Sequence, residues 1–338
     1  MTRELTVALV GATGVVGEQF LQIMEARALP VRELRLLATA RSAGRAIPFR
    51  GETLTVAETT AEALAGADVV FVSASTEASR HWCPIARDLG AVAFDDSSAF
   101  RMEPDVPLVV PEVNGETLRS HRGIIATPNC STVPVVLTLA PLMRERAVRR
   151  VIADTYQSVS GSGGAAVVEL REQTAARLAD RPHEPEVYPK QIAFNTIPQV
   201  DLFLEDGYTK EEWKMIAESR KILGQADLAI SATCVRVPTF VAHAAAVHVE
   251  LDAPLTAAAA RVLWSGQDGL AVVDDPVNAG YPTPVDSAHR DPVFVGRVRQ
   301  DASHPNGLAY WVVSDNLRKG AALNIVQMVE WMLADGCL

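Results

Sequence analysis

Residues 5–17 read LTVALVGATGVVG, and this stretch decides the fold of the first part of the chain. Leu5–Val10 is a short apolar run of strand length, and Val16–Met24 has the apolar spacing of a helix. A glycine-rich turn between a strand and a helix brings backbone N–H groups and a helix N-terminus close to a pyrophosphate. The spacing is GxxGxxG rather than the commoner GxGxxG, and a tight turn that needs glycine is the alternative interpretation. The residues expected to contact a dinucleotide here are Gly11, Thr13, Gly14, Val15, Val16 and Gly17.

The next expected strand, Leu34–Ala38, ends in a segment that bears on the choice of coenzyme. A protein that prefers NAD usually has an acidic residue at this strand end, where it binds the ribose hydroxyls. The chain has Thr39, Arg41 and Ser42 instead, and the segment holds no carboxylate that would repel a 2′-phosphate. These residues predict NADP. A solvated loop arginine is the alternative interpretation of Arg41.

Strands and helices alternate up to residue 126, which predicts a doubly wound parallel sheet. The further elements expected here are the strands Ala67–Ser73, Ala91–Phe94, Val106–Val113 and Gly123–Ala126 and the helix Glu77–Leu89. In such a sheet, the loops after the carboxyl ends of the strands line the ligand crevice. Ser73 and Arg101 are therefore candidates for ligand contact.

Residues 127–132 read TPNCST and place Cys130 directly after a Pro-Asn turn. The apolar run Val133–Leu142 follows, and Ser131 and Thr132 are residue types that cap helix N-termini. The unpaired N–H groups and the positive dipole end of such a helix would favour a thiolate over a thiol. Cys130 is therefore a candidate nucleophile. A small residue that packs a loop against a helix is the alternative interpretation.

The second half of the chain changes in character, with a Gly- and Ser-rich loop at residues 158–164. The strands expected here are Val151–Gln157, Ala229–Val237 and Ala244–Leu251 and three more that begin near Val272, Val293 and Ala309. The helices expected here are Ala165–Leu178, one that opens at Lys210 and a closing amphipathic helix, Ala321–Leu333. Residues 181–188, with two prolines, are expected to be irregular.

Composition limits the class of protein. A chain of 338 residues is too long for one ordinary core, so we expect two domains. The formal charge of -10 argues against a partner such as nucleic acid or an anionic membrane surface. No apolar run reaches membrane-spanning length. The four cysteines are scattered without metal-ligand spacing, which predicts no metal site and a cytoplasmic location.

Taken together, these segments resemble the aspartate-β-semialdehyde dehydrogenase family nearly from end to end. The stretches that carry the resemblance are GATGVVG, LLATARSAG, DDSSAFR, PLVVPEVN, PNCST, TYQSVSGSG, IAFNTIPQVD, YTKEEWKM, TCVRVP followed by His243, VGRVRQD and SDNLRKGAALN. The resemblance implies an α/β protein with a Rossmann-type doubly wound sheet and a glyceraldehyde-3-phosphate-dehydrogenase-like α+β catalytic domain. It predicts that residues 1–130 with 316–338 bind NADP. Residues 131–315 are then the catalytic and dimerisation domain of a homodimer or a dimer of dimers.

The family reduces L-aspartyl-4-phosphate to L-aspartate-4-semialdehyde with NADPH, an early step toward lysine, threonine and methionine. By resemblance, Cys130 forms a thioester with the aspartyl group, His243 is the general acid and base, and Gln157 orients the acyl group. The implied substrate-binding residues are Arg236 for the α-carboxylate, Glu211 for the α-ammonium group, and Arg101, Lys214 and the nearby Asn129 for the phosphate. The implied coenzyme contacts further along the chain are Ser160, Gly161 and Asn316.

The chemistry agrees with this assignment. Hydride cannot reduce a free carboxylate, so the acyl group has to stay activated after phosphate leaves, and a cysteine thioester keeps it so. Taken singly, Glu211 and Lys214 could be an exposed ion pair on a helix, and His243 a histidine satisfied within the core. The whole-chain resemblance favours the functional interpretation of all three.

Two other functions stay open at this stage. An N-acetyl-glutamyl-phosphate reductase uses the same thioester chemistry, although Glu211 and Arg236 suit a free amino acid better than an acetylated one. A paralogue that keeps the fold and binds NADP without catalysis should have lost the nucleophile or the base. This chain has both.

Overall fold

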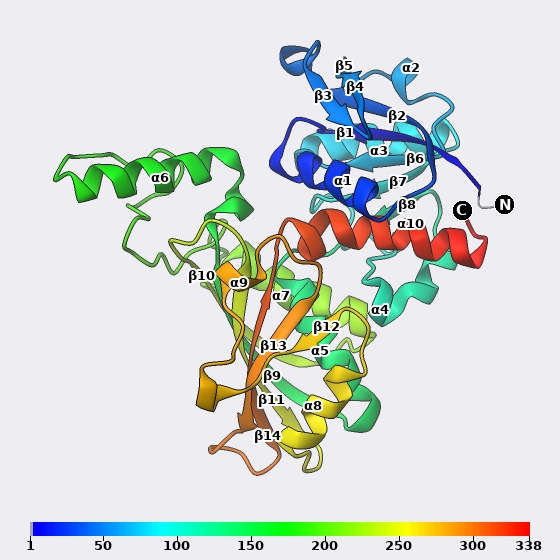
Figure 1. The fold of residues 1–338 in the computed structure, drawn as a ribbon. Coiled ribbons are helices and arrows are strands. Elements are labelled where there is room, and N and C mark those ends of the chain that lie inside the picture. Colours follow the sequence, from blue (N-terminus) through cyan, green and yellow to red (C-terminus); the bar gives the residue numbers. More distant parts are fainter. Residues whose placement is uncertain (1–2) are drawn as a thin grey trace. The chain divides into compact units, whose positions relative to one another are not determined.

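The computed structural model describes residues 3–338, which divide into two compact units (Figure 1). Unit 1 comprises the chain up to Pro128 together with Ala321–Leu338, and unit 2 comprises Asn129–Gly320. Within residues 3–338, no helix combines the length and the apolar character that a membrane crossing requires.

Unit 1 is built on a six-stranded parallel sheet with the strand order β5-β2-β1-β6-β7-β8. Its strands are β1 Leu5–Val10, β2 Val31–Ala38, β5 Ala57–Glu58, β6 Val69–Val72, β7 Val92–Asp95 and β8 Ile124–Ala126. Its helices are α1 Val15–Ala26, α2 Ala61–Leu64, α3 Thr76–Asp88, α4 Pro111–Asn114 and α10 Leu323–Asp335. The strand order reverses between β1 and β6, so the ligand crevice of this sheet lies at their carboxyl ends. The predicted doubly wound parallel sheet is confirmed.

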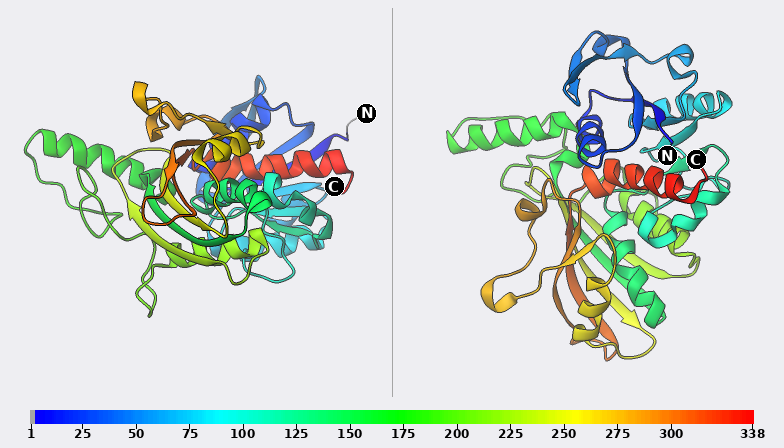
Figure 2. Two further views of the ribbon diagram at one scale, coloured as in Figure 1. Left: turned by 90° about the horizontal axis from the view of Figure 1, so that it is seen from below. Right: turned by 45° about the vertical axis from the view of Figure 1, so that its right-hand side comes forward.

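The central strand β1 is buried along its whole length, as is usual for a parallel strand whose sheet is covered on both faces, and Leu5, Val7 and Leu9 belong to the core of unit 1. The C-terminal helix α10 packs beside α1 within unit 1, as the blue and red ribbons of Figure 2 show. The Asn324 side chain on α10 donates hydrogen bonds of 2.8 Å to the Val109 carbonyl and to Thr127 Oγ1. These bonds tie the end of the chain to the segment that precedes Cys130.

The strand predicted at Val106–Val113 is wrong. Only Leu108 forms an isolated bridge to β8, and the chain then turns into α4. The Asn114 side chain accepts the N–H of Val110 and donates to the carbonyl of Leu108, which takes both groups away from a ladder. Pro111 has no N–H and suits the first position of a helix. The apolar composition of the segment cannot reveal that the Asn114 side chain bonds to backbone groups that a strand would otherwise pair.

Unit 2 contains a six-stranded mixed sheet in the order β10-β9-β11-β14-β13-β12. Its strands are β9 Val148–Gln157, β10 Ala229–Arg236, β11 His243–Leu251, β12 Leu270–Val272, β13 Val293–Gln300 and β14 Gly307–Ser314. Its helices are α5 Thr132–Glu145, α6 Gly164–Leu178, α7 Lys210–Leu223, α8 Ala257–Ser265 and α9 Pro284–Ser287. Helices α5, α7 and α8 pack on one face of the sheet, whereas α6 projects from the rest of unit 2 (Figures 1 and 2). The predicted second, α+β domain is confirmed.

Several elements were absent from the sequence-based predictions. They include the hairpin of β3 Ala46–Phe49 and β4 Glu52–Thr55, the short strand β5 and the helices α2, α8 and α9. The strand expected to begin near Val272 ends there instead. Short elements such as these have too few residues for a clear period, so their pairing partners decide them.

The topology brings chemistry-bearing residues to one edge of the unit 2 sheet. Strands β9 and β10 run parallel and end together, with Gln157 opposite Arg236. Strand β11 runs antiparallel to β9 and begins at the same edge, where His243 pairs with Ser314 at the end of β14. Residues that are distant in sequence therefore meet at this edge.

Candidate functional site

Cys130 lies in the loop that leads into α5, two residues before the first helical residue, Thr132. The expected helix is present, but Ser131 at the N-cap position forms no side-chain cap. The hydroxyl of Ser131 instead accepts a hydrogen bond from Asn129 Nδ2 at 3.0 Å and lies 3.4 Å from a carboxylate oxygen of Glu211. The first N–H groups of α5 therefore receive no bond from this hydroxyl, and their positive end favours a negative charge at the Cys130 loop.

The Glu211 carboxylate links several of the predicted site residues. Its Oε1 accepts hydrogen bonds from Asn129 Nδ2 at 2.6 Å and from Gln157 Nε2 at 2.9 Å. Its Oε2 lies 3.3 Å from the Lys214 ammonium group one turn further along α7. Burial alone would raise the pKa of Glu211, but the charge of Lys214 and the two amide hydrogen bonds outweigh it and lower the pKa to about 2. Glu211 is therefore a buried, permanently charged group at neutral pH.

Lys214 is engaged by two carboxylates in this structure. Its Nζ lies 2.8 Å from Asp201 Oδ2, in addition to the contact with Glu211. The sequence reasoning expected Lys214 to hold a phosphate and Glu211 to hold an ammonium group, and it did not foresee Asp201. A ligand that carries an ammonium group and a phosphate could bind to Glu211 and Lys214 in place of their bond to each other.

His243 is a neutral imidazole in which one ring nitrogen is hydrogen-bonded and the other is not. Its Nδ1 lies 3.0 Å from both the backbone N and the hydroxyl of Ser158. Its Nε2 is buried and has no hydrogen-bond partner among the described residues. Burial, together with the charge of Arg236, lowers the pKa of His243 to about 3. The Nε2–H of His243 is therefore available to donate one hydrogen bond to a ligand.

Arg236 lies beside His243, and it too has one nitrogen that is hydrogen-bonded and another that is not. Its Nη1 donates a hydrogen bond of 2.7 Å to the Ser158 carbonyl, while its Nε has no partner in the described chain. Gly161 fits against both side chains, because a Cβ there would lie 3.1 Å from Arg236 Nη1 and from His243 Nε2. The Tyr188 ring centroid lies 5.9 Å from the Arg236 guanidinium carbon. A side chain at 161 would therefore crowd both of these groups.

Ser160 and Asn316, both expected to contact the coenzyme, lie in unit 2 next to His243. Asn316 Oδ1 lies within 3.2 Å of the hydroxyls of Ser158 and Ser160 and accepts the N–H of Ala242 at 3.0 Å. Ser158 was missed as a site residue, although it lies within the quoted stretch TYQSVSGSG. Its bonds to His243 depend on the pairing of β9 with β11, for which the sequence carries no local signal.

A second set of predicted residues lines a pocket in unit 1, at the carboxyl ends of β1, β2 and β6. The predicted residues in its lining are Gly11, Thr13, Gly14, Thr39, Arg41, Ser42 and Ser73. The others are placed differently. Val15 and Val16 begin α1, and Gly17 packs against the turn, where a Cβ would lie 2.4 Å from the Gly11 carbonyl oxygen.

This pocket fits a dinucleotide. Gly11 has a φ of +88°, and a Cβ there would lie 2.0 Å from the Ser73 carbonyl oxygen. The N-cap residue of α1, Gly14, makes no side-chain cap, so the first N–H groups of the helix are available to a pyrophosphate. Arg41 borders the same pocket on the side where the second strand ends.

The pocket also corrects one step of the sequence reasoning. No carboxylate follows the second strand directly, but β5 pairs with β2 and sets Glu58 opposite Ala38. Glu58 thereby lines the same pocket as Arg41. A carboxylate that can accept ribose hydroxyls therefore accompanies the arginine that suits a 2′-phosphate.

Arg101 belongs to unit 1, in the loop after β7. It is buried, and its Nη2 donates a hydrogen bond of 3.1 Å to the Asp96 carbonyl. The same unit holds Ser73, whose hydroxyl donates to Asp96 Oδ2 at 2.9 Å. Arg101 and the coenzyme pocket thus form one group in unit 1, and Cys130 with its neighbours forms the other in unit 2.

From residue 3 onward, no three His, Cys, Asp or Glu side chains are grouped so that they could hold a metal ion.

Comparisons with known proteins match both units. Residues 6–121 match the family model "Semialdehyde dehydrogenase, NAD binding domain", and residues 139–319 match "Semialdehyde dehydrogenase, dimerisation domain". The chain is 44% identical over 336 residues to the aspartate-semialdehyde dehydrogenase of Aquifex aeolicus, covering 98% of this chain and 99% of that protein. It is 46% identical over 338 residues to that of Bacillus subtilis, covering 98% of both chains.

A solved structure agrees with these relatives. The crystal structure of aspartate semialdehyde dehydrogenase II from Vibrio cholerae, complexed with ASA, superposes with a TM-score of 0.95 at 44% identity and covers 99% of both chains. The predictions of the family, of an enzyme and of a nicotinamide coenzyme are therefore confirmed. The chain belongs to the aspartate-semialdehyde dehydrogenase family.

Proposed function

We propose that this enzyme reduces L-aspartyl-4-phosphate to L-aspartate-4-semialdehyde with NADPH through a thioester on Cys130, in the biosynthesis of lysine, threonine and methionine. The observation that carries the proposal is the link that Glu211 makes between the Cys130 loop and Gln157 at the edge of the sheet. In this reading, unit 2 is the catalytic and dimerisation domain and unit 1 is the NADP-binding domain.

Cys130 acts as the nucleophile. Its sulfur, as the thiolate favoured at the N-terminus of α5, bonds to the C4 carbonyl carbon, and the bond from that carbon to the phosphate oxygen breaks. Phosphate leaves with its electron pair, and the acyl group stays activated as a thioester. NADPH, when bound, supplies the hydride that reduces this acyl group to the level of an aldehyde.

His243 handles the proton on the acyl oxygen. Its pKa near 3 keeps it neutral, so Nε2–H can donate to an oxygen that gains negative charge in the tetrahedral adduct. As the adduct collapses, the electron pair of the oxygen re-forms the carbonyl, the hydrogen-bonded proton stays on Nε2, the carbon–sulfur bond breaks, and Cys130 leaves as the thiolate. Gln157 is fixed for orienting the acyl group, because Thr155 donates to its Oε1 and Glu211 accepts from its Nε2.

The charges of the substrate find complementary groups on this chain. Arg236 offers a planar guanidinium with an open Nε to the α-carboxylate. Glu211 binds the α-ammonium group, and Lys214, Arg101 and Asn129 bind the phosphate. NADP is held by the glycine turn and by Arg41, and Ser160, Gly161 and Asn316 are the further coenzyme contacts that the family resemblance implies.

The test is NADPH formation from L-aspartate-4-semialdehyde, with and without phosphate, for the wild type, Cys130→Ala and the control Cys337→Ala. We expect phosphate-dependent turnover in the wild type and the control and none in Cys130→Ala. Turnover by Cys130→Ala would overturn the thioester mechanism. A folded, NADP-binding wild type that acts only on the N-acetyl-glutamyl substrate would overturn the substrate, and one without any turnover would be a non-catalytic paralogue.

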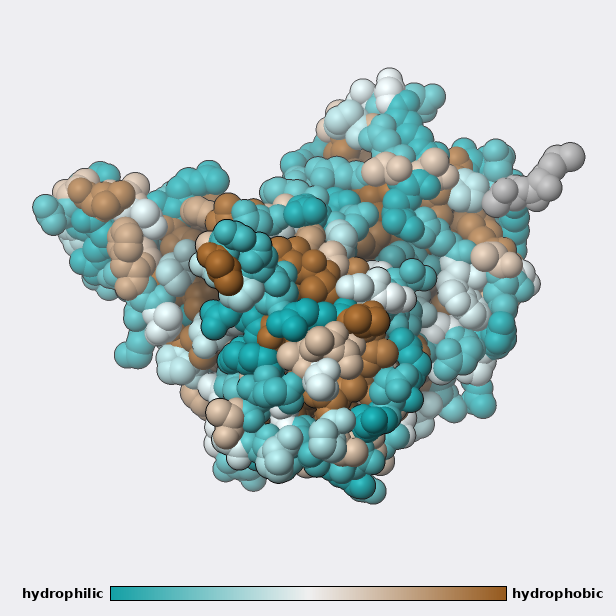
Figure 3. Space-filling model, turned by 60° about the horizontal axis from the view of Figure 1, so that its bottom comes forward, coloured by the Kyte–Doolittle hydropathy of each residue, from teal (hydrophilic) through white to brown (hydrophobic). Residues whose placement is uncertain are grey.

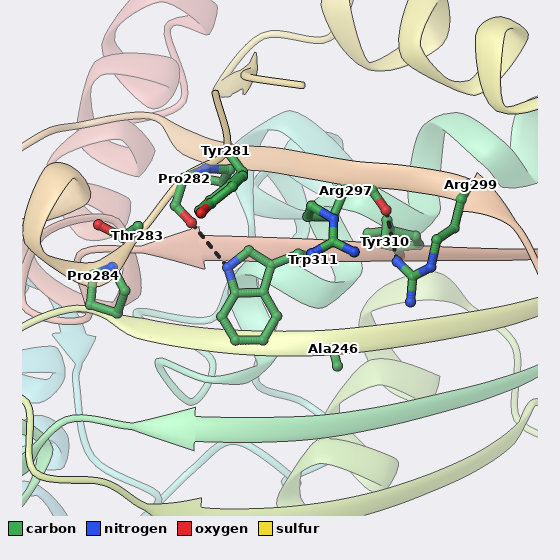
Figure 4. Close-up of a pocket in the computed structure, with 9 residues that line it drawn as sticks. All are labelled: Ala246, Tyr281, Pro282, Thr283, Pro284, Arg297, Arg299, Tyr310 and Trp311. Atoms are coloured by element: carbon green, nitrogen blue, oxygen red, sulfur yellow. Dashed lines mark hydrogen bonds between the residues drawn. The ribbon is translucent and has the colours of Figure 1, made fainter. Parts of the chain in front are cut away.

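We further propose a homodimer, or a dimer of dimers, formed through the sheet of unit 2. The face of the sheet away from α5, α7 and α8 carries Trp311, whose indole N–H donates to the Pro282 carbonyl beside Arg297 and Ala246 (Figure 4). Tyr156 lies next to Trp311 and is 40% exposed. Apolar patches stand out on the side of unit 2 that Figure 3 brings forward. A second copy would cover such an apolar, aromatic face.

Light scattering tests this proposal. The wild type should have at least twice the mass of one chain. Ala246→Arg should release the single chain, whereas Val262→Arg, at a residue of α8 that is 73% exposed, should not. A monomeric wild type would exclude the dimer.

The cysteines bear on the cellular location. All four are free, and one of them is the proposed thiolate nucleophile, so they support a reducing, cytoplasmic location.

A further inference from the structure

Glu218 is a buried carboxylate on α7 that the reaction described above does not use. It follows Glu211 by seven residues, two helical turns, so both side chains lie on the same face of α7. Only 1% of Glu218 is exposed. Its Oε2 accepts a hydrogen bond of 2.6 Å from the backbone N–H of Asn129, the residue directly before Cys130.

Three polar groups of Asn129 bond to residues other than Cys130, and its side-chain oxygen Oδ1 lies 3.7 Å from the Cys130 sulfur. Glu218 accepts from its backbone N–H, and Glu211 accepts from its side-chain amide at 2.6 Å. The carbonyl oxygen of Asn129 accepts the N–H of Thr132 at 2.9 Å, at the start of α5. The peptide planes before and after Asn129 are therefore both held by hydrogen bonds, and the second of them joins Asn129 to Cys130. The orientation of this second plane helps to set where the Cα–Cβ bond of Cys130 points.

We propose that Glu218 is a positioning residue for Cys130: it holds the Asn129 N–H, and through it the nucleophile, at the N-terminus of α5. The proposal rests on the proposed role of Cys130 as the nucleophile. A carboxylate suits this task because a charge-assisted hydrogen bond to an N–H is about twice as strong as a neutral one. Asn129 is itself buried, so loss of the acceptor would leave its N–H unsatisfied and favour a shift of the loop.

Three variants separate this role from general stability. Glu218→Leu removes the acceptor and is close in size. Glu218→Gln keeps a carbonyl oxygen for the Asn129 N–H but loses the charge. Glu212→Gln is the matched control, because Glu212 is also a buried carboxylate on α7 but bonds to the N–H groups of Thr209 and Cys234 and not to the loop.

The measurements are kcat, the KM for NADP, the temperature of unfolding, and the rate at which iodoacetamide alkylates Cys130, located by peptide mass mapping. We expect Glu218→Leu to lower kcat and the alkylation rate by roughly 10- to 100-fold, with the KM for NADP unchanged. Glu218→Gln should recover most of both rates. Glu212→Gln should lower the unfolding temperature and leave both rates close to wild type.

A folded Glu218→Leu enzyme whose kcat and alkylation rate match those of Glu212→Gln would overturn the inference. If Glu218→Leu does not fold, Glu218→Asp decides, since its shorter carboxylate keeps the charge but cannot reach the Asn129 N–H. Wild-type rates in Glu218→Asp would then refute the role. Full activity in Cys130→Ala would instead refute the proposed mechanism, so the two failures can be told apart.

Discussion

The backbone N–H of Ser158 donates a hydrogen bond of 3.0 Å to Nδ1 of His243. An N–H can only donate, so Nδ1 accepts, and the neutral imidazole carries its hydrogen on Nε2. The Ser158 hydroxyl, also 3.0 Å from Nδ1, can turn its own hydrogen toward the same atom. A residue at the end of β9 thereby selects the tautomer of a residue at the start of β11.

Removal of the Nε2–H should therefore slow the reaction. We expect His243→Asn to lower kcat by roughly 100- to 10,000-fold, because a positioned general acid contributes about this factor. The KM for NADP should stay within a factor of about two. His248→Asn, on the same strand, is the control, since His248 is half-buried and lies 3.1 Å from Asp301. Equal kcat values for the two variants would contradict the role of His243.

Stability should fall in acid because His243 is buried in its neutral form. Its folded pKa of about 3 lies below the ordinary histidine pKa of 6.5, so below pH 6.5 the unfolded chain binds a proton that the folded chain does not bind until about pH 3. The free energy of unfolding should then decrease by up to about 1.4 kcal/mol per pH unit between these values. At pH 5 the loss is about 2 kcal/mol relative to pH 7.

Denaturant unfolding at pH 5, 6 and 7 measures this loss, and the comparison with His243→Gln isolates it, because the variant should lack this part of the pH dependence. Glu211 adds a second loss of stability below pH 4.5, the ordinary pKa of a glutamate, since its folded pKa is about 2. Identical pH profiles for the wild type and His243→Gln between pH 5 and 7 would show that His243 titrates alike in both states.

Gly320→Ala should disturb Cys130 directly. Gly320 lies in the π-helical turn Arg318–Ala322, and a Cβ there would lie 2.7 Å from the Cβ of Cys130. Overpacking of this kind costs about 1–3 kcal/mol unless the loop moves, so we expect kcat to drop at least about tenfold while NADP still binds. Gly266→Ala is the matched control, because its Cβ would approach nothing closer than 3.7 Å. Unchanged kinetics in Gly320→Ala would show that the loop absorbs the extra carbon.

The choice between NADPH and NADH should depend on Arg41 and Glu58 in opposite directions. Arg41→Ala should raise the KM for NADPH by about 10- to 100-fold and change the KM for NADH little, because only NADPH carries the 2′-phosphate. Glu58→Gln should lower the KM for NADPH a few-fold, since it removes a negative charge from the same pocket. Steady-state kinetics with both coenzymes test this, and a Glu58→Gln enzyme with an unchanged ratio of the two KM values would contradict it.

Local patterns in the sequence predicted the elements that local forces decide. The apolar run Leu5–Val10, the glycine turn and the helical spacing after it correspond to β1 and α1, because strand length and helical period are set within a few residues. The apolar run after Cys130 likewise corresponds to α5. The alternation of such segments was enough for the parallel sheet of unit 1.

Contacts between distant segments were beyond the reach of local patterns. The register of β5 against β2 brings Glu58 to the coenzyme pocket, and side-chain bonds of Asn114 turn an expected strand into α4. Glu218 meets the backbone of Asn129 although the two are 89 residues apart. A residue type states which bonds a side chain can form, so the sequence made Cys130 a candidate nucleophile, and the family resemblance supplied the candidates for the acid and the charged groups. Which partner satisfies each group depends on strand register and helix packing, and these follow from burial summed over the whole fold.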